Sequence, residues 1–232
     1  MNISIICCYY NEINLVKAKL DSFLKFIKKN NFDAEIIIVD NNSNDGTTDF
    51  LKKLSLSKHE INIKFIFNEK NLGKGGSIKK ACSIAKGKFM CIFDIDEYSY
   101  NDLLLGIKFV ESHEIDLLIG SRILENKKFI YKKNLYGVIA LTNLLNKLFG
   151  LKLTDAAGAT KIFKLDSYNL TKIHSSGFNF EFELICKFAK KQFKIGEYPN
   201  NYEPRTYAEG KKINPWKDGI KILITILRSY FI

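Results

Sequence analysis

Residues 89–97 read FMCIFDIDE, a run of five apolar residues that ends on two aspartates separated by one residue. A continuous apolar run of this length is typical of a strand that is buried on both faces. Asp94 and Asp96 would follow the end of that strand, where both carboxylates can face one hard divalent cation such as Mg²⁺. The same two acids could instead cap the next helix, which aspartate also favours.

The rest of the first half repeats this alternation of apolar strand-like runs with helix-like segments. Further strands are expected at residues 3–9, 34–39, 61–67 and 115–119, and helices at 15–29, 47–54, 77–85 and 101–112. Strands that alternate with helices predict an α/β fold, with a mainly parallel sheet flanked by helices on both faces.

Polar clusters follow several of the expected strands. Residues 10–12 (YNE) come after the first, residues 40–42 (DNN) after the second, and residues 120–122 (GSR) after the fifth. In parallel sheets the ligand binds at the carboxyl ends of the strands. We therefore expect these distant acids and one arginine to converge on one edge with Asp94 and Asp96.

Each of two further segments allows two interpretations, one as a ligand-binding segment and one as a purely structural turn. Asp40 can accept hydrogen bonds from a nucleobase or a ribose hydroxyl, or it can form an Asx turn with residues 41–46. Lys74 lies in a glycine turn, NLGKGG at 71–76, and could meet a phosphate. The turn lacks the spacing of a P-loop or of a dinucleotide-binding fingerprint, so a simple turn before a helix is the alternative.

Composition and charge narrow the class of protein. The chain has 232 residues, 46% of them hydrophobic, and a net charge of +11 with a pI of about 9.3. The first 121 residues are neutral, and the excess lies mainly in residues 122–133 and 187–232. This predicts an ordinary globular protein with an anionic partner: nucleic acid, a phosphorylated substrate or a membrane surface. Zinc and hydrolase sites are not expected, because no C-x-x-C or G-x-S-x-G motif occurs.

The last residues, 216–232, predict an amphipathic helix. Ile220, Leu223, Ile224, Leu227 and Phe231 follow helical spacing, Ile222 and Ile226 widen the apolar face, and Lys217, Lys221 and Arg228 punctuate it. Residues 135–149 are similarly apolar and are flanked by Lys132, Lys133 and Lys152. Such helices can lie in a bilayer interface, or they can pack on the core or a partner subunit.

No targeting or membrane-spanning segment is expected. No apolar run reaches the roughly 18–20 residues of a spanning helix, and residues 1–12 lack a signal-peptide pattern. The five cysteines are expected to be buried free thiols in a reducing cytosol. The sequence thus favours a soluble or peripheral protein, cytoplasmic and at the inner face of the membrane.

The order and spacing of these motifs resemble family 2 glycosyltransferases of the GT-A fold. The resemblance is carried by YNE at 10–12, VDNNSNDGT at 39–47, NLGKGGSIKKA at 71–81 and AKGKFMCIFDID at 85–96. In the second half, GSR at 120–122, TDAAGATKIFK at 154–164, GFNFEFEL at 177–184 and YEPRTYAEGKKINPWKDG at 202–219 are similar to the dolichyl- or polyprenyl-phosphate sugar synthases. The resemblance implies a single GT-A domain over 1–232, with a nucleotide-sugar half (1–121), an acceptor half (122–215) and the C-terminal helix (216–232).

The resemblance also implies an activity and a site. A hexose would pass, with inversion, from a UDP-, GDP- or dTDP-linked sugar to a polyprenyl or dolichyl phosphate. The catalytic residues would be Asp96, Asp155 and Arg122, and the Mg²⁺ or Mn²⁺ ligands Asp94, Asp96 and Glu97. The nucleotide sugar would contact Tyr10, Asn11, Glu12, Asp40, Asn41, Gly73, Lys74 and Asp94. Phosphates would bind Arg122, Arg205, Lys211 and Lys212. Asp155, Glu181 and Glu183 would contact sugar hydroxyls or orient lysines, or else cap helices or carry surface charge.

Three departures from the family pattern affect this assignment. Asn41 stands where the family usually has a second aspartate, so one nucleoside contact loses its charge. DIDEY at 94–98 is one residue shorter than the family's stretch, which counts against Glu97 as a ligand. Residues 156–159 (AAGA) are small where the family varies, which leaves the acceptor contacts open. The membrane-spanning helices that some relatives carry after this domain are not expected.

Other functions stay open from the sequence. A saccharide acceptor, as in surface-polysaccharide or lipopolysaccharide assembly, uses the same donor chemistry. A non-catalytic nucleotide-sugar binder or a nucleic-acid binder are more remote alternatives. Acidic clusters interleave with the basic residues and no aromatic–basic RNA motif is present, so nucleic acid is not the expected partner. A homo-oligomer is a possible state.

Overall fold

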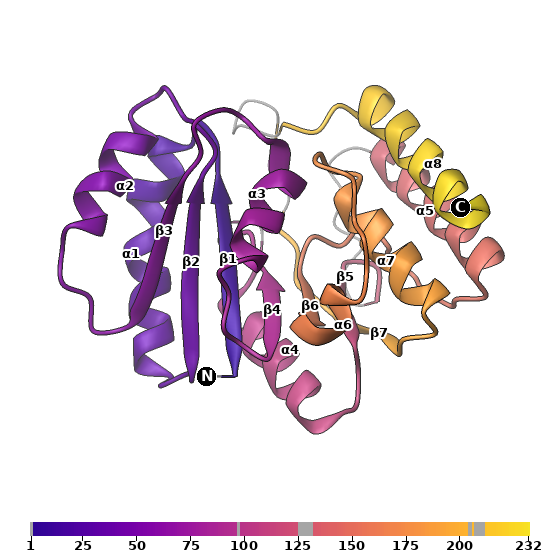
Figure 1. Ribbon diagram of the computed structural model, residues 1–232, viewed down its shortest axis with the longest axis horizontal. Helices are drawn as coiled ribbons and strands as arrows, with labels where there is room; N and C mark the ends of the chain where they lie inside the picture. The colour runs from indigo at the N-terminus through magenta and orange to yellow at the C-terminus, as the bar shows by residue number, and fades with distance from the viewer. Residues whose placement is uncertain (1, 97, 125–131, 204–205, 207–211) are drawn as a thin grey trace.

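A seven-stranded sheet forms the centre of the described residues, which are 2–96, 98–124, 132–203, 206 and 212–232 of this computed structural model (Figure 1). The strand order is β3-β2-β1-β4-β6-β5-β7. The strands are β1 (Ile3–Tyr9), β2 (Ala34–Asp40), β3 (Asn62–Phe67), β4 (Phe89–Ile92), β5 (Leu117–Ser121), β6 (Lys161–Lys164) and β7 (Ile195–Pro199). The helices are α1 (Ile13–Lys29), α2 (Thr47–Ser55), α3 (Gly73–Cys82), α4 (Tyr100–Ser112), α5 (Lys132–Phe149), α6 (Leu165–Asn169), α7 (Phe180–Lys190) and α8 (Pro215–Phe231).

The mainly parallel sheet expected from the sequence is confirmed. β1 pairs in parallel with β2 and β4, and β2 with β3. β6 runs antiparallel between β4 and β5, which turns a parallel sheet into a mixed one. β4 and β5 therefore still point the same way, and the polar clusters that follow β1, β2, β4 and β5 lie at one edge of the sheet.

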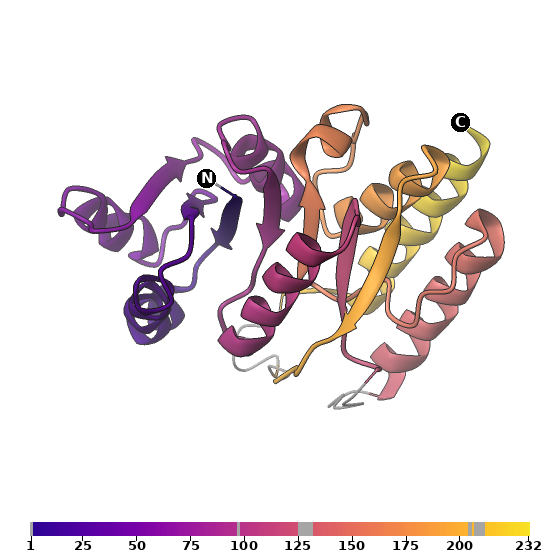
Figure 2. The ribbon, with the colours of Figure 1, turned by 90° about the horizontal axis from the view of Figure 1, so that it is seen from below.

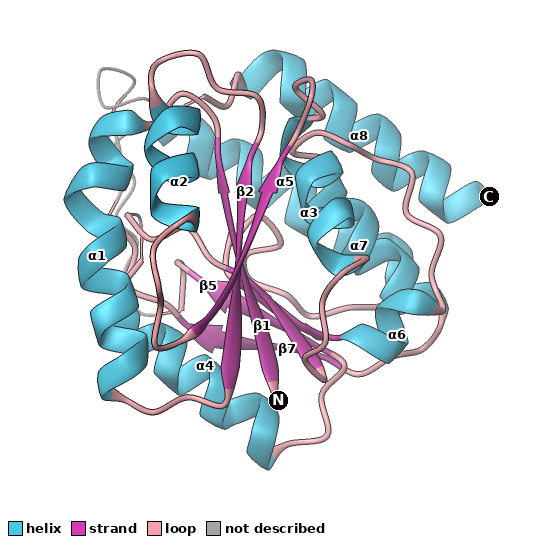
Figure 3. Cartoon of the chain, turned by 60° about the vertical axis from the view of Figure 1, so that its left-hand side comes forward, coloured by secondary structure: helices cyan, strands magenta, loops and turns pink. Residues whose placement is uncertain are grey.

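Helices cover both faces of the sheet, as expected (Figure 3). Each face has its own apolar core. Buried side chains of α1, α2 and α4 pack on one face, and those of α3, α5, α7 and α8 pack on the other. Successive strand residues alternate between the two cores, so Ile36 and Ile38 face α1 while Ile37 and Val39 face α3. This double burial explains the continuous apolar runs in the sequence.

The prediction for residues 71–85 was wrong in its boundary. The glycines expected as a turn form the first turn of α3, which begins at Gly73 and ends at Cys82. Gly73 has a φ of +74°, and a Cβ on Gly75 would lie 2.5 Å from Cβ of Phe180. The glycines therefore serve close packing of α3 on α7 and not only a change of chain direction.

The C-terminal helix is confirmed as α8, but its two sets of apolar residues have opposite environments. Ile222 and Ile226 are buried against α5 and α7, whereas the stripe of Ile220, Leu223, Ile224, Leu227 and Phe231 is exposed. α5 and α8 lie side by side at the end of the molecule furthest from β3 (Figures 1 and 2). None of the described helices combines the length and the hydrophobicity that crossing a membrane requires.

We expect Gly75→Ala to lower the free energy of unfolding by roughly 1–3 kcal/mol, because the added methyl group overlaps Phe180. Gly137→Ala in α5 is the matched control, since nothing lies within 4 Å of its added Cβ. The control should be neutral or stabilise by about 0.5–1 kcal/mol. Urea denaturation measures both, and equal stabilities would show that α3 does not pack this tightly on α7.

Candidate functional site

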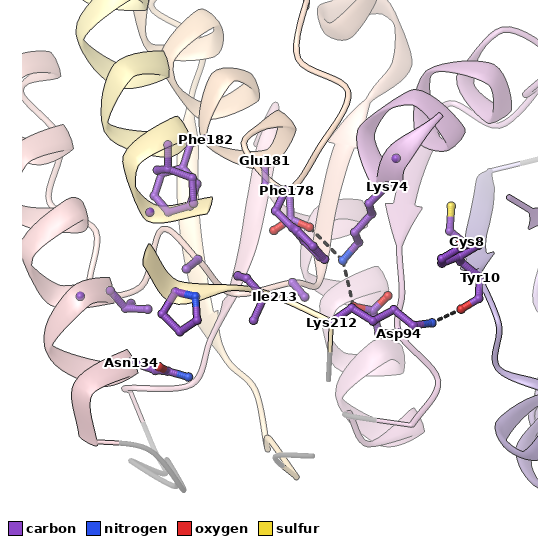
Figure 4. Close-up of a pocket in the computed structure, with 18 of the residues that line it drawn as sticks. Cys8, Tyr10, Lys74, Asp94, Asn134, Phe178, Glu181, Phe182, Lys212 and Ile213 are labelled. Carbon is purple, nitrogen blue, oxygen red and sulfur yellow. Dashed lines mark hydrogen bonds and ion pairs between the residues drawn. The ribbon is translucent and has the colours of Figure 1, made fainter. Parts of the chain in front are cut away.

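A large cavity opens at the carboxyl edge of the sheet, with a volume of about 1550 Å³ (Figure 4). Both halves of the chain line it. The residues predicted for the site that line it are Tyr10, Asn11, Glu12, Asn41, Gly73, Lys74, Asp94, Asp96, Arg122, Glu181 and Lys212. Glu183 is buried outside the lining, where it accepts from the backbone N–H groups of His174 and Ser175. Asp40 and Asp155 are buried and are absent from the lining. Glu97, Arg205 and Lys211 lie outside the described residues.

The YNE segment is held by the loop that follows β2. The backbone N–H of Asn11 donates to Oγ of Ser43 over 2.9 Å, and the Asn11 side chain accepts from the backbone N–H of Asn44 over 2.8 Å. The N–H of Glu12 donates to Oγ1 of Thr47 over 3.0 Å. Residues 10–12 and 43–47 therefore form one unit, which fixes Tyr10 and Glu12 at the rim of the cavity.

Asp40 has the structural role considered from its sequence, and one of its oxygens stays without a donor. Its Oδ2 accepts from Oγ1 of Thr48 over 2.7 Å and from the N–H of Ser43 over 3.4 Å, which holds the loop in place. Its Oδ1 is buried and has no hydrogen-bond partner among the described residues. A buried acceptor without a donor is costly, so Oδ1 is suited to a donor that a ligand would supply.

The amide of Asn41 explains why an aspartate would not serve at this position. Its Nδ2 donates to Oδ1 of Asn71 over 2.8 Å, while its Oδ1 accepts from Nδ2 of Asn68 and from the N–H of Leu72 over 3.1 and 2.8 Å. An aspartate can accept but cannot donate. Asn41 thus ties the end of β2 to the segment that leads into α3.

A row of alternating charges runs from the cavity wall into the protein (Figure 4). Nζ of Lys74 lies 2.9 Å from Oδ2 of Asp94 and 3.0 Å from Oε1 of Glu181. The other oxygen of Glu181 lies 3.1 Å from Nζ of Lys161, which is fully buried and also donates to the carbonyl of Gly158. Four elements contribute one residue each, from α3, the end of β4, α7 and the start of β6.

Burial and pairing act in opposite directions on these ammonium groups. Burial would lower the pKa of Lys74, but the carboxylates of Asp94 and Glu181 raise that pKa well above its ordinary value. For Lys161, burial outweighs the attraction of Glu181 and lowers the pKa. Lys74 is therefore a permanent cation in the cavity wall.

Arg122 is held by Asp155, which lies directly behind it. Nε and Nη2 of Arg122 donate to the two oxygens of Asp155 over 2.6 and 2.8 Å, and the backbone N–H of Arg122 adds a third bond. The guanidinium also lies over the ring of Tyr202, 5.2 Å from its centre. Burial opposes both charges, yet their attraction lowers the pKa of Asp155 and raises that of Arg122. Asp155 therefore orients Arg122 and does not itself face the cavity.

Lys212 lies at the rim of the cavity, beside Tyr10. Its Nζ lies 2.9 Å from Oε1 of Glu12, donates to the carbonyl of Tyr10 and lies 5.4 Å from the centre of the Tyr10 ring (Figure 4). The segment that precedes α8 is thereby tied to the segment that follows β1.

The carboxylates in the cavity wall supply part of the ligand set that a divalent cation requires. Asp94 and Asp96 both line the cavity, and carboxylate oxygens are the ligands that Mg²⁺ and Mn²⁺ prefer. Within the described ranges, no group of three or more Asp, Glu, His or Cys side chains is arranged to hold a metal ion. Two carboxylates suffice where a substrate's phosphates complete the coordination, as is usual for Mg²⁺.

The far end of the cavity is apolar and lies between α5 and α8. Its lining includes Tyr136, Val138, Leu141, Ile213, Trp216, Ile220 and Leu223.

Cys8 is half-buried in the charged part of the wall, and burial raises its pKa to about 12. The thiol is therefore protonated near neutral pH and is no nucleophile.

Sequence reasoning missed several residues that build the site. Glu197 of β7 accepts from the backbone N–H groups of Thr154 and Asp155 over 2.7 and 2.8 Å, and so fixes the loop that carries Asp155. Lys161 is the first residue of the run KIFK at 161–164, and nothing in that run marks its first lysine as buried. The aromatic support of Arg122 by Tyr202 has no signal in the sequence either.

Comparisons with known proteins agree with this architecture. The sequence model described as glycosyl transferase family 2 matches residues 4–170. A dolichyl-phosphate beta-glucosyltransferase of Dictyostelium discoideum is 24% identical over 251 residues, covering 99% of this chain and 74% of the relative. One from Saccharomyces cerevisiae is 26% identical over 261 residues, covering 99% and 75%.

A solved structure extends the likeness to the fold. Glucosyl-3-phosphoglycerate synthase from Mycobacterium tuberculosis, crystallised with Mn²⁺, UDP and phosphoglyceric acid, matches with a TM-score of 0.73. The match covers 100% of this chain and 79% of that one at 14% identity, so it concerns the fold alone. The expected GT-A fold is confirmed.

We expect Asp155→Ala to lower the free energy of unfolding by roughly 3–5 kcal/mol near neutral pH, because it removes the carboxylate that pairs with the buried Arg122 guanidinium. The pKa of Asp155 is lowered in the folded protein, so its contribution is present above the unfolded pKa and is lost as pH falls. The difference from the wild type should therefore shrink below about pH 4.

Asp21→Ala is the matched control for this measurement. It removes an exposed carboxylate that lies 2.7 Å from Lys25 within α1, and should cost less than about 1 kcal/mol. Denaturant titrations at several pH values measure both variants. An Asp155 variant as stable as the control would contradict the assignment of a buried, paired Arg122.

Proposed function

The chain belongs to glycosyl transferase family 2, and on that premise we propose that it transfers a hexose from a nucleoside-diphosphate sugar to a polyprenyl phosphate. One observation carries the proposal: a single cavity joins a charged end, with Asp94, Lys74 and Arg122, to an apolar end between α5 and α8. A polyprenyl phosphate has the same division, a charged head on an apolar chain. The relatives described as dolichyl-phosphate beta-glucosyltransferases support this acceptor.

The donor nucleoside would bind at the ends of β1 and β2. Tyr10 offers a ring at the rim of the cavity. Oδ1 of Asp40, a buried acceptor behind the lining, would accept from a base or a ribose that enters beyond that lining. Lys74 would meet the diphosphate, since its ammonium is a permanent cation in the cavity wall. The structural neighbour crystallised with UDP supports a nucleotide ligand.

Asp94 and Asp96 would hold a divalent cation together with the donor diphosphate. When bound, the cation supplies Lewis-acid stabilisation of the charge that grows on the leaving diphosphate, without a proton donor. Lys74 would add a second positive charge on the same group. Neighbours crystallised with Mn²⁺ or Mg²⁺ support this cofactor.

Arg122 would bind the acceptor phosphate. Its guanidinium is held from behind by Asp155 and supported by Tyr202, so its geometry is set before the acceptor arrives. A phosphate oxygen attacks the anomeric carbon, and the bond from that carbon to the diphosphate breaks on the opposite face, which inverts the configuration. Because the attacking phosphate is already anionic at neutral pH, the residues need to position it and no strong general base is needed.

The exposed apolar stripe of α8 would rest on the membrane that holds the acceptor. Trp216 and Phe231 are 81% and 78% exposed, and Lys217, Lys221 and Arg228 lie among the exposed residues of the helix. Apolar side chains flanked by basic ones favour an interface with anionic lipid. The apolar end of the cavity lies beside this stripe, since Ile220 and Leu223 belong to both.

We expect the purified protein to transfer labelled hexose from one of the UDP-, GDP- or dTDP-linked sugars to a polyprenyl phosphate in the presence of Mn²⁺. Asp94→Ala and Asp96→Ala should each reduce the rate at least about 100-fold, because the diphosphate loses its metal-borne stabilisation. Asp166→Ala in α6, which follows β6 at the opposite edge of the sheet, should keep wild-type activity. Extraction of the labelled lipid into organic solvent measures the product.

Two results would contradict the proposal. Transfer to an added oligosaccharide but not to the lipid phosphate would establish the saccharide alternative. Full activity in both aspartate variants would remove the cation from the mechanism. The anomeric configuration of the product, compared with that of the donor, tests inversion.

For the membrane contact, we expect the wild type to float with vesicles that contain anionic lipid. The double variant Leu227→Ser/Phe231→Ser should bind at least about tenfold more weakly, since two apolar side chains no longer leave water. Leu56→Ser/Leu170→Ser alters two exposed apolar side chains elsewhere and should bind like the wild type. Equal flotation of all three proteins would exclude α8 as the contact.

A further inference from the structure

Lys74 occupies a place that a cation at Asp94 would compete for. Its Nζ lies 2.9 Å from Oδ2 of Asp94, within hydrogen-bond distance, so this carboxylate is already matched by a positive charge. A divalent cation on the same carboxylate would stand within a few ångströms of the ammonium. Two positive charges so close in a half-buried wall repel each other strongly.

Lys74 is not free to swing away from this position. Glu181 lies 3.0 Å from the ammonium on its inner side, and the second oxygen of Glu181 is paired with the fully buried Lys161. Lys161 also donates to the carbonyl of Gly158. An outward movement of Lys161 would leave two buried acceptors, that carbonyl and the carboxylate of Glu181, without this donor. The pair of Glu181 and Lys161 is therefore an anchor that keeps the ammonium beside Asp94.

A nucleoside diphosphate changes this balance. It brings at least two negative charges, which can lie between an ammonium and a metal ion and be attracted by both. The repulsion that opposes the metal alone then becomes a shared attraction for the diphosphate.

We propose that Lys74, anchored by Glu181 and Lys161, makes cation binding at Asp94 conditional on a nucleoside diphosphate. The inference rests on the proposed function in that it takes Asp94 as a cation ligand. Metal and donor then load together, and the metal site stays weak in the absence of the nucleotide. A purely structural Lys74, serving only to tie α3 to β4 and α7, would affect the metal equally with and without nucleotide.

The test is a titration of the full chain with Mn²⁺, in which electron paramagnetic resonance measures the free ion, with and without UDP, GDP or dTDP. A protein-free titration corrects for Mn²⁺ held by the nucleotide itself. In the wild type, the preferred nucleotide should tighten Mn²⁺ binding by roughly 5- to 150-fold. In Lys74→Met, binding of Mn²⁺ alone should tighten roughly tenfold, and the effect of the nucleotide should shrink accordingly.

Glu181→Gln should move Mn²⁺ binding in the opposite direction. The substitution removes the negative charge of Glu181, so Asp94 is the remaining carboxylate that pairs with the Lys74 ammonium and holds it more strongly. Mn²⁺ without nucleotide should therefore bind more weakly than it does to the wild type. A loosened site would weaken binding in both variants, so the opposite signs separate the proposal from simple damage. Lys79→Met removes a lysine of the same helix that donates to the carbonyl of His174, and should behave like the wild type.

Unchanged Mn²⁺ binding in Lys74→Met, or weaker binding in both Lys74 and Glu181 variants with intact thermal unfolding, would overturn the inference and leave the transferase proposal standing. Wild-type protein that binds Mn²⁺ equally tightly with and without every nucleotide would also overturn it. If the wild type bound no Mn²⁺ under any condition, both the inference and the cation at Asp94 would fall. The transfer assay would then decide separately whether the reaction itself stands.

Discussion

A charge withdrawn from water needs an opposite charge beside it, and this constraint organises the carboxyl edge of the sheet. Arg122 is matched by Asp155, and Lys74 and Lys161 share Glu181. Each pair joins segments that are far apart in the chain, and the Lys74–Glu181 pair joins the first half to the second across the cavity wall. The site is therefore rigid because its charges are buried and paired. Arg122 and Lys74, which line the cavity, still present positive charge to it.

The antiparallel strand β6 makes these pairs geometrically possible. A strand that runs against its neighbours starts where they end, so Lys161 and the preceding loop with Asp155 reach the same edge as Asp94 and Arg122. In a purely parallel sheet the loop before β6 would lie at the opposite edge. One reversed strand of four residues thus brings Lys161 and Asp155, the buried partners of Glu181 and Arg122, to this edge.

Much of this could be read from the sequence because burial on two faces leaves a strong mark. The apolar runs at residues 3–9 and 34–39 allow few other interpretations. Residues 10–12 and Asn41, which follow these runs, line the cavity as expected, whereas Asp40 is buried behind the lining. The rest was inaccessible for physical reasons. A four-residue strand with lysine at both ends resembles a surface segment, and pairing partners such as Lys161 and Glu181 are defined only by three-dimensional proximity. α8 is apolar around most of its circumference, so its pattern could not say which side faces the core.

The two-sided character of α8 has a consequence for how the molecule can meet a flat surface. Because Ile222 and Ile226 are sunk into the core shared with α5 and α7, the helix cannot roll about its own axis. A surface that takes up the outer stripe receives the entire domain in one pose, with the mouth between α5 and α8 at a set height and tilt. An acceptor confined to that surface would then find the mouth by lateral diffusion in two dimensions, with no reorientation of the domain at each turnover.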